Sequence, residues 1–308
     1  MTRTASSHPL FDGRVDFDTV ADRIRNHPVE GPPAELRKAY ATLMLGEGAD
    51  GHPVPASATA ERLGQVPVLR FNGSADGAPT DAAIVYFHGG GDVFGSPATH
   101  VRLLTALSRI TGLRVYAVDY RLAPEHQWPA QLEDATTVVS ELRTRGIDRI
   151  GLAGDSSGGH LALVTALHQA AAGTPVQAVA AFSPNTDRSG KSDTREANTP
   201  RDVMNSDQTD LRMARLTFGT DFDANDPDVS PLLADLSLLP PTHLEVGNVE
   251  VLLGDSLLLH EYGKRAGADI SLHRTDDAFH MWQLWTPWLP EAEQSITRAG
   301  DSLTRHLS

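Results

Sequence analysis

Cysteine is absent from this chain of 308 residues. Its absence excludes disulfide bonds, catalysis by a thiolate and zinc sites with cysteine ligands. Redox chemistry therefore does not indicate a cellular compartment.

Positive charge is scarce, since 26 Lys and Arg face 40 Asp and Glu and leave a formal net charge of −14. Such a chain repels nucleic acid and anionic membrane surfaces, so we expect neither as a partner, and a substrate with several negative charges is disfavoured. No apolar run approaches the length of a membrane span, and the polar start lacks the apolar core of a signal peptide. These features predict a cytoplasmic protein.

Short apolar runs alternate with helical patterns along most of the chain, which is typical of a doubly wound α/β sheet. The predicted strands cover residues 66–71, 83–87, 114–118, 149–153, 176–182, 242–246 and 270–273. The predicted helices cover residues 99–111, 130–145, 158–172, 253–266 and 291–306. A chain of this length can bury one large core, and we predict a single α/β domain with a lid.

The segment Gly154-Asp155-Ser156-Ser157-Gly158 lies between a predicted strand and a predicted helix. A serine that attacks a carbonyl group stands on a tight strand-to-helix turn, and glycines two positions away on either side leave room for that strained backbone. The Gly-x-Ser-x-Gly pattern alone is weak evidence, because unrelated loops match it. With its flanking strand and helix, the segment predicts Ser156 as a nucleophile.

The run His88-Gly89-Gly90-Gly91 directly follows a predicted buried strand. Consecutive glycines let backbone N–H groups point into a cleft, as an oxyanion hole requires. The expected donors are Gly90 and Gly91, with Gly89 as a further candidate, together with Ser157, which follows the nucleophile. A glycine-rich turn without a ligand is one alternative. Phosphate binding fits poorly, because this run carries neither a Lys-Ser/Thr pair nor a Gly-x-Gly-x-x-Gly pattern.

A serine nucleophile needs a general base, and of the thirteen histidines only His280 lies after the last predicted strand and before the last predicted helix. A loop at that place returns to the edge of the sheet where the nucleophile stands, so we predict His280 as the base. Histidines elsewhere, such as His27 and His168, are more simply explained as satisfied surface or core residues. His88 belongs to the glycine turn and is expected to brace it.

Four motifs occur in order along the chain: His88-Gly89-Gly90-Gly91, Asp119-Tyr120-Arg121-Leu122-Ala123-Pro124-Glu125-His126, Pro129-Ala130 with Glu133-Asp134-Ala135, and Gly154-Asp155-Ser156-Ser157-Gly158-Gly159. With these motifs the chain resembles the hormone-sensitive-lipase-like (bacterial type IV) esterases of the α/β-hydrolase fold, over about residues 82–282. Further segments resemble the branch with small-molecule esterases and monoterpene lactone hydrolases: Ser230-Pro231-Leu232-Leu233, Leu239-Pro240-Pro241 and Glu250-Val251-Leu252-Leu253.

The resemblance implies one α/β-hydrolase domain over residues 1–308, with a mostly parallel sheet flanked by helices. Residues from about 1 to 50 and from about 187 to 222 do not fit the strand–helix alternation. In the resembled family these two places form a helical cap over the active site. We therefore expect a cap built from both segments.

The acid that orients the histidine is less clearly marked. The resemblance implies an aspartate three residues after Gly247, and this chain has Glu250 there. A glutamate can do the same work, because the role needs only a fixed carboxylate. Asp255 is the competitor, although its place in the first turn of a predicted helix is equally explained by pairing with the helix dipole. Asp155 is too close to the nucleophile to reach His280, and we expect it behind the site.

Methionines recur in the predicted cap and beside the predicted base. Met44, Met204, Met213 and Met281 are expected to surround one apolar pocket, which suits irregular acyl or alcohol groups. Ordinary cap packing is the alternative for each of them. The residue after the three glycines is usually aromatic in the resembled family but is Asp92 here, which we expect at the mouth of the cleft or facing solvent.

The combined interpretation is a serine carboxylester hydrolase with the triad Ser156, His280 and Glu250, acting through an acyl-enzyme on short-to-medium acyl esters, acetylated small molecules or lactones. No metal or organic cofactor is implied, and a homodimer is possible. An elimination enzyme, a non-catalytic small-molecule binder and a peptidase or amidase are the alternatives. Relatives that eliminate often modify the serine and receptor-like binders lose the histidine, whereas Ser156 and His280 are both present.

Overall fold

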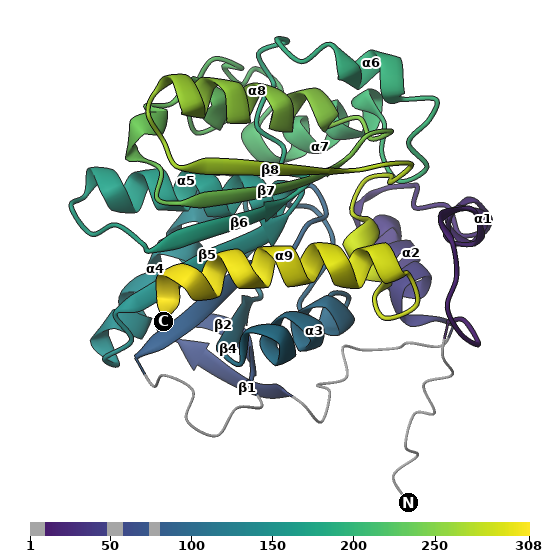
Figure 1. The fold of residues 1–308 in the computed structure, drawn as a ribbon. Coiled ribbons are helices and arrows are strands. Elements are labelled where there is room, and N and C mark those ends of the chain that lie inside the picture. The colour runs from purple at the N-terminus through teal and green to yellow at the C-terminus, as the bar shows by residue number, and fades with distance from the viewer. Residues whose placement is uncertain (1–9, 48–57, 74–80) are drawn as a thin grey trace, which may run out of the picture.

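The computed structural model describes residues 10–47, 58–73 and 81–308, which build an eight-stranded sheet with helices on both faces (Figure 1). The strands are β1 (Ala58–Leu63), β2 (Val66–Phe71), β3 (Ala82–Phe87), β4 (Arg114–Val118), β5 (Arg149–Asp155), β6 (Ala178–Phe182), β7 (Thr242–Gly247) and β8 (Ile270–Thr275). Their order across the sheet is β1-β2-β4-β3-β5-β6-β7-β8. Strands β1, β2 and β4 pair antiparallel and all later pairs are parallel, so the predicted mostly parallel sheet is confirmed.

Strand β1 is the one element of the sheet that the sequence analysis missed. It lies at the edge of the sheet, paired only with β2, and most of its side chains are exposed or half-buried. An edge strand with one covered face does not produce the apolar run by which the inner strands were recognised. The predicted strand at residues 176–182 begins two positions later, at Ala178.

The long helices lie close to their predicted positions. The helices are α1 (Phe17–Asn26), α2 (Pro33–Leu45), α3 (Val101–Thr111), α4 (Ala130–Thr144), α5 (Ser157–Ala171), α6 (Thr194–Asn198), α7 (Asp207–Phe218), α8 (Leu253–Arg265) and α9 (Pro290–Leu307). Short 3₁₀ helices span Pro231–Leu233, Leu236–Leu238 and Trp282–Trp285. Helices α3 and α9 cover one face of the sheet, and α4, α5 and α8 cover the other (Figure 1).

Strand β3 explains why the central strands are apolar without interruption. Ala83, Val85 and Phe87 point into the core beneath α4 and α5, while the intervening residues point into the core beneath α3 and α9. Side chains of a strand alternate between its two faces, and here both faces are buried. All six β3 residues are fully buried as a result. Because β3 to β8 run parallel to one another, their carboxyl ends lie at one edge of the sheet.

Helices α1, α2, α6 and α7 lie in the two segments predicted as a cap. Residues 1–9 and 48–50 of the first segment lie outside the described residues. The second segment leaves the sheet after β6 and returns before β7, so its helices start near the edge where the parallel strands end. Figure 1 draws α1 and α2 on the side of the molecule where β8 ends, and α6 above them.

The tryptophans near the predicted base are packed inside the molecule. Trp282 and Trp285 have no exposed surface, and Trp288 keeps 9% of its surface exposed. Phe11 contacts the rings of both Trp285 and Trp288, edge to face. These rings are therefore part of the core between α9 and the N-terminal segment rather than an apolar surface for lipid or a partner.

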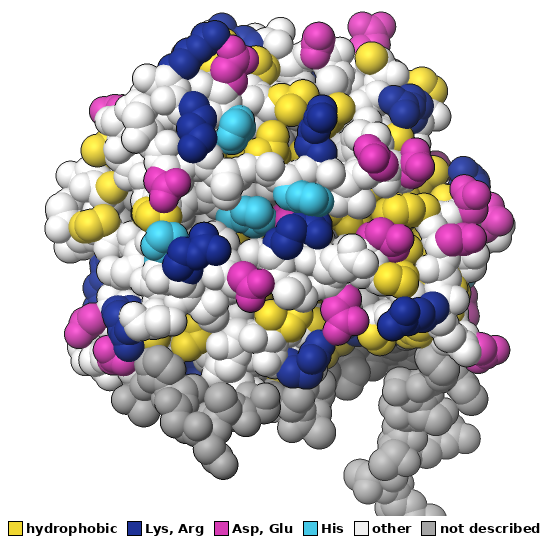
Figure 2. Space-filling view, in the orientation of Figure 1, with side chains coloured by type: hydrophobic (Ala, Val, Ile, Leu, Met, Phe, Trp, Pro, Cys, Tyr) yellow, Lys and Arg dark blue, Asp and Glu magenta, His cyan; other side chains and the backbone are white. Residues whose placement is uncertain are grey.

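The visible surface mixes both signs of charge (Figure 2), with acidic side chains frequent on the side where α1 lies in Figure 1. Apolar side chains are scattered among them. Within the described ranges, no helix combines the length and the apolar character needed to cross a membrane.

Candidate active site

Ser156 stands at the turn between β5 and α5, with a backbone φ of 54° and ψ of −120°. A residue with a side chain adopts this region at a cost of about 1–3 kcal/mol, and such strain is concentrated at functional sites. The turn lifts the serine above the ends of the parallel strands, as the predicted nucleophile elbow requires. Its side chain faces a cavity and its residue keeps 8% of its surface exposed.

The two glycines that flank Ser156 are required by close backbone approaches. A Cβ atom on Gly154 would lie 2.2 Å from the carbonyl oxygen of Gly158. A Cβ atom on Gly158 would lie 2.1 Å from the carbonyl oxygen of Phe87, at the end of β3. No side chain fits at these distances, so the pattern Gly-x-Ser-x-Gly follows from the packing of the turn against the sheet.

His280 connects Ser156 to Glu250. Its Nε2 atom lies 2.9 Å from the Oγ atom of Ser156, and its Nδ1 atom lies 2.9 Å from Oε2 of Glu250. An ionised carboxylate can only accept, so Nδ1 carries the hydrogen and donates to Glu250. The Nε2 atom is then free to accept the hydroxyl proton of Ser156. In such an arrangement the imidazole can take the proton of the serine while the carboxylate fixes its orientation.

Two further groups hold the other oxygen of the Glu250 carboxylate. Its Oε1 accepts the hydroxyl of Ser183 at 3.0 Å and the backbone N–H of Gly247. Ser183 directly follows β6 and has a φ of 47°, so its backbone is also strained. Ser183 was not predicted from the sequence, although a polar residue just after a buried strand was a usable signal, because parallel strands end at one edge.

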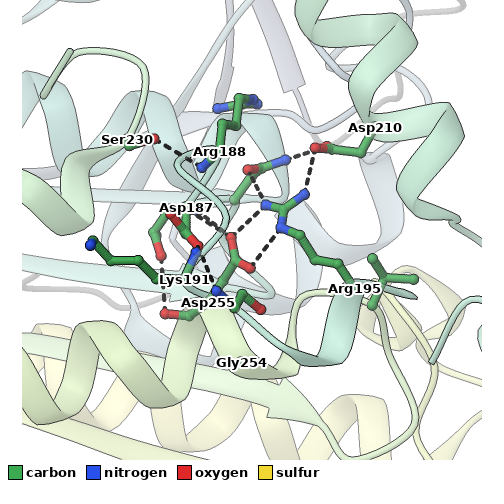
Figure 3. A network of polar contacts seen from close by, with 12 residues as sticks. Asp187, Arg188, Lys191, Arg195, Asp210, Ser230, Gly254 and Asp255 are labelled. Atoms are coloured by element: carbon green, nitrogen blue, oxygen red, sulfur yellow. Dashed lines mark hydrogen bonds and ion pairs between the residues drawn. The ribbon is translucent and has the colours of Figure 1, made fainter. Parts of the chain in front are cut away.

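Asp255 has a different place from Glu250. Its carboxylate is fully buried and accepts the guanidinium of Arg195 and the backbone N–H groups of Thr186 and Asp187 (Figure 3). Arg195 also donates to Asp210 on α7, at 2.8 Å. Asp255 therefore joins the cap segment to α8. Asp255 does lie in the first turn of α8, as predicted, and its charge is in addition matched by the buried Arg195.

Burial and neighbouring charge act in opposite directions on the base. Burial lowers the pKa of His280, but the hydrogen bond and the charge of Glu250, with those of Asp202 and Asp155, raise it above its usual value overall. Burial also raises the pKa of Glu250, which the contact with His280 only partly offsets. The protonated imidazole is therefore stabilised by its surroundings, as a base that must accept a proton needs.

The glycine run contributes two residues to the wall of the cavity, Gly90 and Gly91. Gly89 lies behind them, since a Cβ atom there would be 2.3 Å from Oδ2 of Asp155. Ser157 begins α5, so its backbone N–H is one of the helical donors without a partner within the helix. Its hydroxyl accepts the backbone N–H of Asp92 at 3.2 Å, which ties the glycine run to the turn of the nucleophile.

Side chains behind the glycine run hold it in place. Nδ1 of His88 lies 2.9 Å from the carbonyl oxygen of Gly89, and its ring stacks on Tyr120. The carboxylate of Asp155 accepts the hydroxyl of Tyr86 at 2.7 Å and lies 3.2 Å from Nε2 of His100. His88 thus braces the turn, and Asp155 is engaged away from His280.

The cavity in front of Ser156 has a volume of about 450 Å³. Its apolar lining comes from both predicted cap segments and from the main domain: Ile24, Pro28, Val29, Leu36, Tyr40, Phe94, Val203, Met204, Met213 and Met281. Three of the four predicted methionines are among them. Met44 is not, because it is fully buried in the core on the α3 and α9 side of the sheet. For Met44, ordinary packing is the correct interpretation.

Asp92 is buried, against the expectation that it lies at the mouth of the cleft or faces solvent. It keeps 2% of its surface exposed, and its Oδ1 has no hydrogen-bond partner. Burial raises the pKa of Asp92 to about 7, although the charge of Arg188 and hydrogen bonds from Tyr120 and Ser157 oppose the shift. Asp92 has a φ of 59°, and it is not among the residues that line the cavity in front of Ser156.

Polar residues of the second cap segment line another part of the cavity, among them Asp202, Ser206 and Asp210. Asp202 was not recognised from the sequence, since it lies in a segment without strand or helix periodicity. As for metals, the described ranges hold no group of three or more His, Cys, Asp or Glu side chains arranged to bind an ion.

Comparisons with known proteins show what the whole chain is similar to. Residues 84–284 match the model of a family described as alpha/beta hydrolase fold. An acetyl-hydrolase of Streptomyces hygroscopicus is 34% identical over 220 residues, covering 70% of this chain and 73% of the relative. An esterase of Acinetobacter venetianus is 32% identical over 225 residues, covering 72% of this chain and 74% of the relative.

A solved structure of an esterase from the bacterial hormone-sensitive lipase family superposes with a TM-score of 0.86 at 34% identity, covering 94% of this chain and 98% of the other. A hormone-sensitive lipase from a metagenome library superposes with the same TM-score of 0.86 at 30% identity, over 96% of this chain and 100% of the other. The chain therefore belongs to the hormone-sensitive-lipase-like carboxylesterase family of the α/β-hydrolase fold.

Proposed function

We propose that this protein is a serine carboxylester hydrolase in which Ser156 attacks, His280 transfers the proton and Glu250 orients the histidine. The observation that carries the proposal is the unbroken line of hydrogen bonds from Ser156 Oγ through His280 to Glu250, each 2.9 Å long. The names of the similar proteins, an acetyl-hydrolase and an esterase, support the same class of reaction.

In the first half of the reaction, Oγ of Ser156 bonds to the ester carbonyl carbon while its proton moves to Nε2 of His280. The tetrahedral intermediate collapses, the carbon–alcohol oxygen bond breaks, and the alcohol leaves with the proton from His280. In the second half, His280 takes a proton from water, which attacks the acyl-enzyme. The acid is released and the hydrogen returns to Ser156.

The negative oxygen of each intermediate is held by backbone N–H groups in this proposal. Gly90 and Gly91 line the cavity beside Ser156, and Ser157 presents the first N–H of α5. Gly89, which is packed against Asp155, is the least favoured of the candidates. Donors of this kind act on charge that develops during the reaction and typically contribute about 10²–10³ in rate each.

The substrates proposed are small esters with short-to-medium acyl chains, acetylated small molecules or lactones. A cavity of about 450 Å³ with a largely apolar lining supports this size range. We also propose that residues 1–308 form a single domain and that the two segments at about 1–50 and 187–222 act as its cap, since both contribute cavity residues. A cytoplasmic location and a homodimer stay predictions.

A panel of p-nitrophenyl esters from acetate to laurate tests the proposal. We expect hydrolysis of the shorter esters, loss of activity after treatment with a serine-directed organophosphate, and labelling of Ser156. Ser156→Ala should leave at most a residual acceleration of about 10³–10⁴ over water. Wild-type turnover by that variant would remove the hydrolase assignment. An elimination activity that survives the substitution would favour the lyase alternative.

A further inference from the structure

We propose that Asp202 is a positioning residue of the active site, whose buried carboxylate joins the loops of the acid and the base and places a second negative charge beside the histidine. The inference rests on the proposed function, because it assigns a role relative to His280 and Glu250. Asp202 lies between α6 and α7, in the second cap segment, and it is one of the residues that line the cavity in front of Ser156.

The contacts of this carboxylate join parts of the chain that are far apart. Its Oδ1 accepts the backbone N–H of His280 at 3.2 Å, across 78 positions of sequence. Its Oδ2 accepts the backbone N–H of Val251 at 3.0 Å, across 49 positions, and Val251 directly follows Glu250. One side chain therefore fixes the backbone next to the acid relative to the backbone of the base.

The same carboxylate is also tied to its own loop. Oδ1 accepts the N–H groups of Met204 at 3.0 Å and Asn205 at 3.3 Å, both of which belong to the cavity wall. With four backbone donors, the charge is held in one place although Asp202 keeps only 7% of its surface exposed. Burial raises the pKa of Asp202, and the charge of His280 and these backbone donors, which favour the ionised form, oppose the shift.

A second residue of the segment supports the same geometry. The side-chain amide of Asn198 donates to the carbonyl oxygen of Glu250 at 2.9 Å. The segment itself is anchored by Arg195, which binds Asp255 and Asp210 as Figure 3 shows. The cap segment thus holds the acid loop at two points while its own position is fixed by a buried ion-pair network.

The electrostatic consequence concerns His280. Four carboxylates act on this imidazole: Glu250 after β7, Asp155 at the end of β5, Asp202 in the cap segment and Asp210 on α7. Glu250 makes direct contact, and the charge of Asp202 is the next to raise the pKa of His280. Removing the charge of Asp202 alone should therefore make the imidazolium less stable without disturbing the contact with Glu250.

The pH profile of kcat/KM distinguishes a carboxylate that acts only through its hydrogen bonds from one that also acts through its charge. Hydrolysis requires His280 to be neutral in the free enzyme, so the acidic limb of kcat/KM reports the pKa of this histidine. Loss of the Asp202 charge should shift that limb to lower pH. It should also lower kcat on the plateau, because the imidazolium formed in the transition state is less stabilised. If Asp202 acts only through its hydrogen bonds, its loss lowers activity but leaves the acidic limb at the same pH.

The test compares Asp202→Asn with Asp187→Asn, using p-nitrophenyl acetate over a range of pH. Asp187 is a matched control, because it is fully buried and its carboxylate accepts the backbone N–H groups of Ser189, Lys191 and Ser192. For Asp202→Asn we expect the acidic limb to move down by about 0.5–1 pH unit and kcat to fall by about tenfold. For Asp187→Asn the limb should stay at its wild-type position.

Asp202→Glu provides the second variant, and it keeps the inference falsifiable if Asp202→Asn does not fold. It keeps the charge with a longer side chain, so the limb should stay within about 0.2 units of wild type while kcat falls. The inference is overturned if Asp202→Asn leaves the limb unmoved, or if the glutamate variant moves it downward. A wild-type enzyme that hydrolyses no ester would overturn the proposed function instead, so the two failures are distinguishable.

Discussion

Nδ1 of His280 lies 2.9 Å from Oε2 of Glu250, while the other oxygen of that carboxylate is held by Ser183 and Gly247. The glutamate is thus bound on both sides, and its longer side chain does not leave it free to rotate. Such a carboxylate can orient the imidazole and stabilise its protonated form without itself accepting the proton.

The first prediction compares the two acids that the sequence left open. Glu250→Gln should lower kcat by about 10³–10⁴, because the neutral amide no longer fixes the tautomer of His280 or stabilises the imidazolium. Asp255→Asn should instead lower the free energy of unfolding by about 3–5 kcal/mol, because Arg195 loses a buried charged partner. Both variants are compared by kcat per titrated active site and by urea unfolding. A normal kcat in Glu250→Gln with a crippled Asp255→Asn would transfer the acid role to Asp255.

The second prediction concerns the glycine run. Gly91 has a φ of 61°, and an added Cβ atom would lie 2.6 Å from Cγ of Met213. We expect Gly91→Ala to lower kcat by about 10²–10³, because displacement of this backbone misplaces a proposed oxyanion donor.

Gly146→Ala is the matched control for Gly91→Ala. Gly146 has a φ of 77° with no atom within 4 Å of the added Cβ, so it carries the backbone cost without the clash. Both variants should lose about 1 kcal/mol of stability from the positive φ, but Gly146→Ala should keep its kcat. Equal kcat values in the two variants would argue against an oxyanion role for Gly91.

The third prediction concerns acyl chain length. Met204 lines the cavity and is only partly buried, so Met204→Ala should widen the cavity and shift the preferred p-nitrophenyl ester to longer chains than the wild-type optimum, expected at about two to eight carbons. Met44→Ala is the control, since Met44 is fully buried away from the cavity. It should cost about 2–5 kcal/mol of stability and leave the chain-length profile unchanged. A wild-type preference for palmitate esters would contradict the proposed substrate class.

The fourth prediction follows from the buried carboxyl of Asp92. Its pKa is raised to about 7, against about 3.9 in an unfolded chain. A raised pKa means that the folded state binds the proton more tightly, so this contribution to stability is present below about pH 4 and is lost as the pH rises to about 7. Asp92→Asn stays neutral, and it should therefore gain about 1–3 kcal/mol relative to wild type between pH 5 and pH 8.

Urea unfolding of Asp92→Asn and of the wild type, at pH 5 and at pH 8, measures this difference in stability. If the difference between Asp92→Asn and wild type stayed constant between these two pH values, the carboxyl of Asp92 would have to be ionised throughout this range.

Local patterns were enough to predict most of the fold. The apolar runs of β3 and β5 are continuous because both faces of each strand are covered. Such runs can be recognised directly in the sequence. Ser156 was predicted from a turn whose glycines are adjacent to it in sequence, and His280 from its place between the last strand and the last helix. Strand β1 was missed, because an edge strand needs few apolar residues.

The directions of individual side chains were decided by the tertiary structure. Glu250 and Asp255 lie on the same short segment, yet one reaches His280 and the other reaches Arg195 of the cap segment. Asp92 is buried, and Met44 lies in the core. Asp202 contacts the backbone of His280 and Val251, which lie far from it in the sequence. Periodicity and turn chemistry act between near neighbours, and these contacts depend on how distant segments pack, so the sequence pattern alone did not contain them.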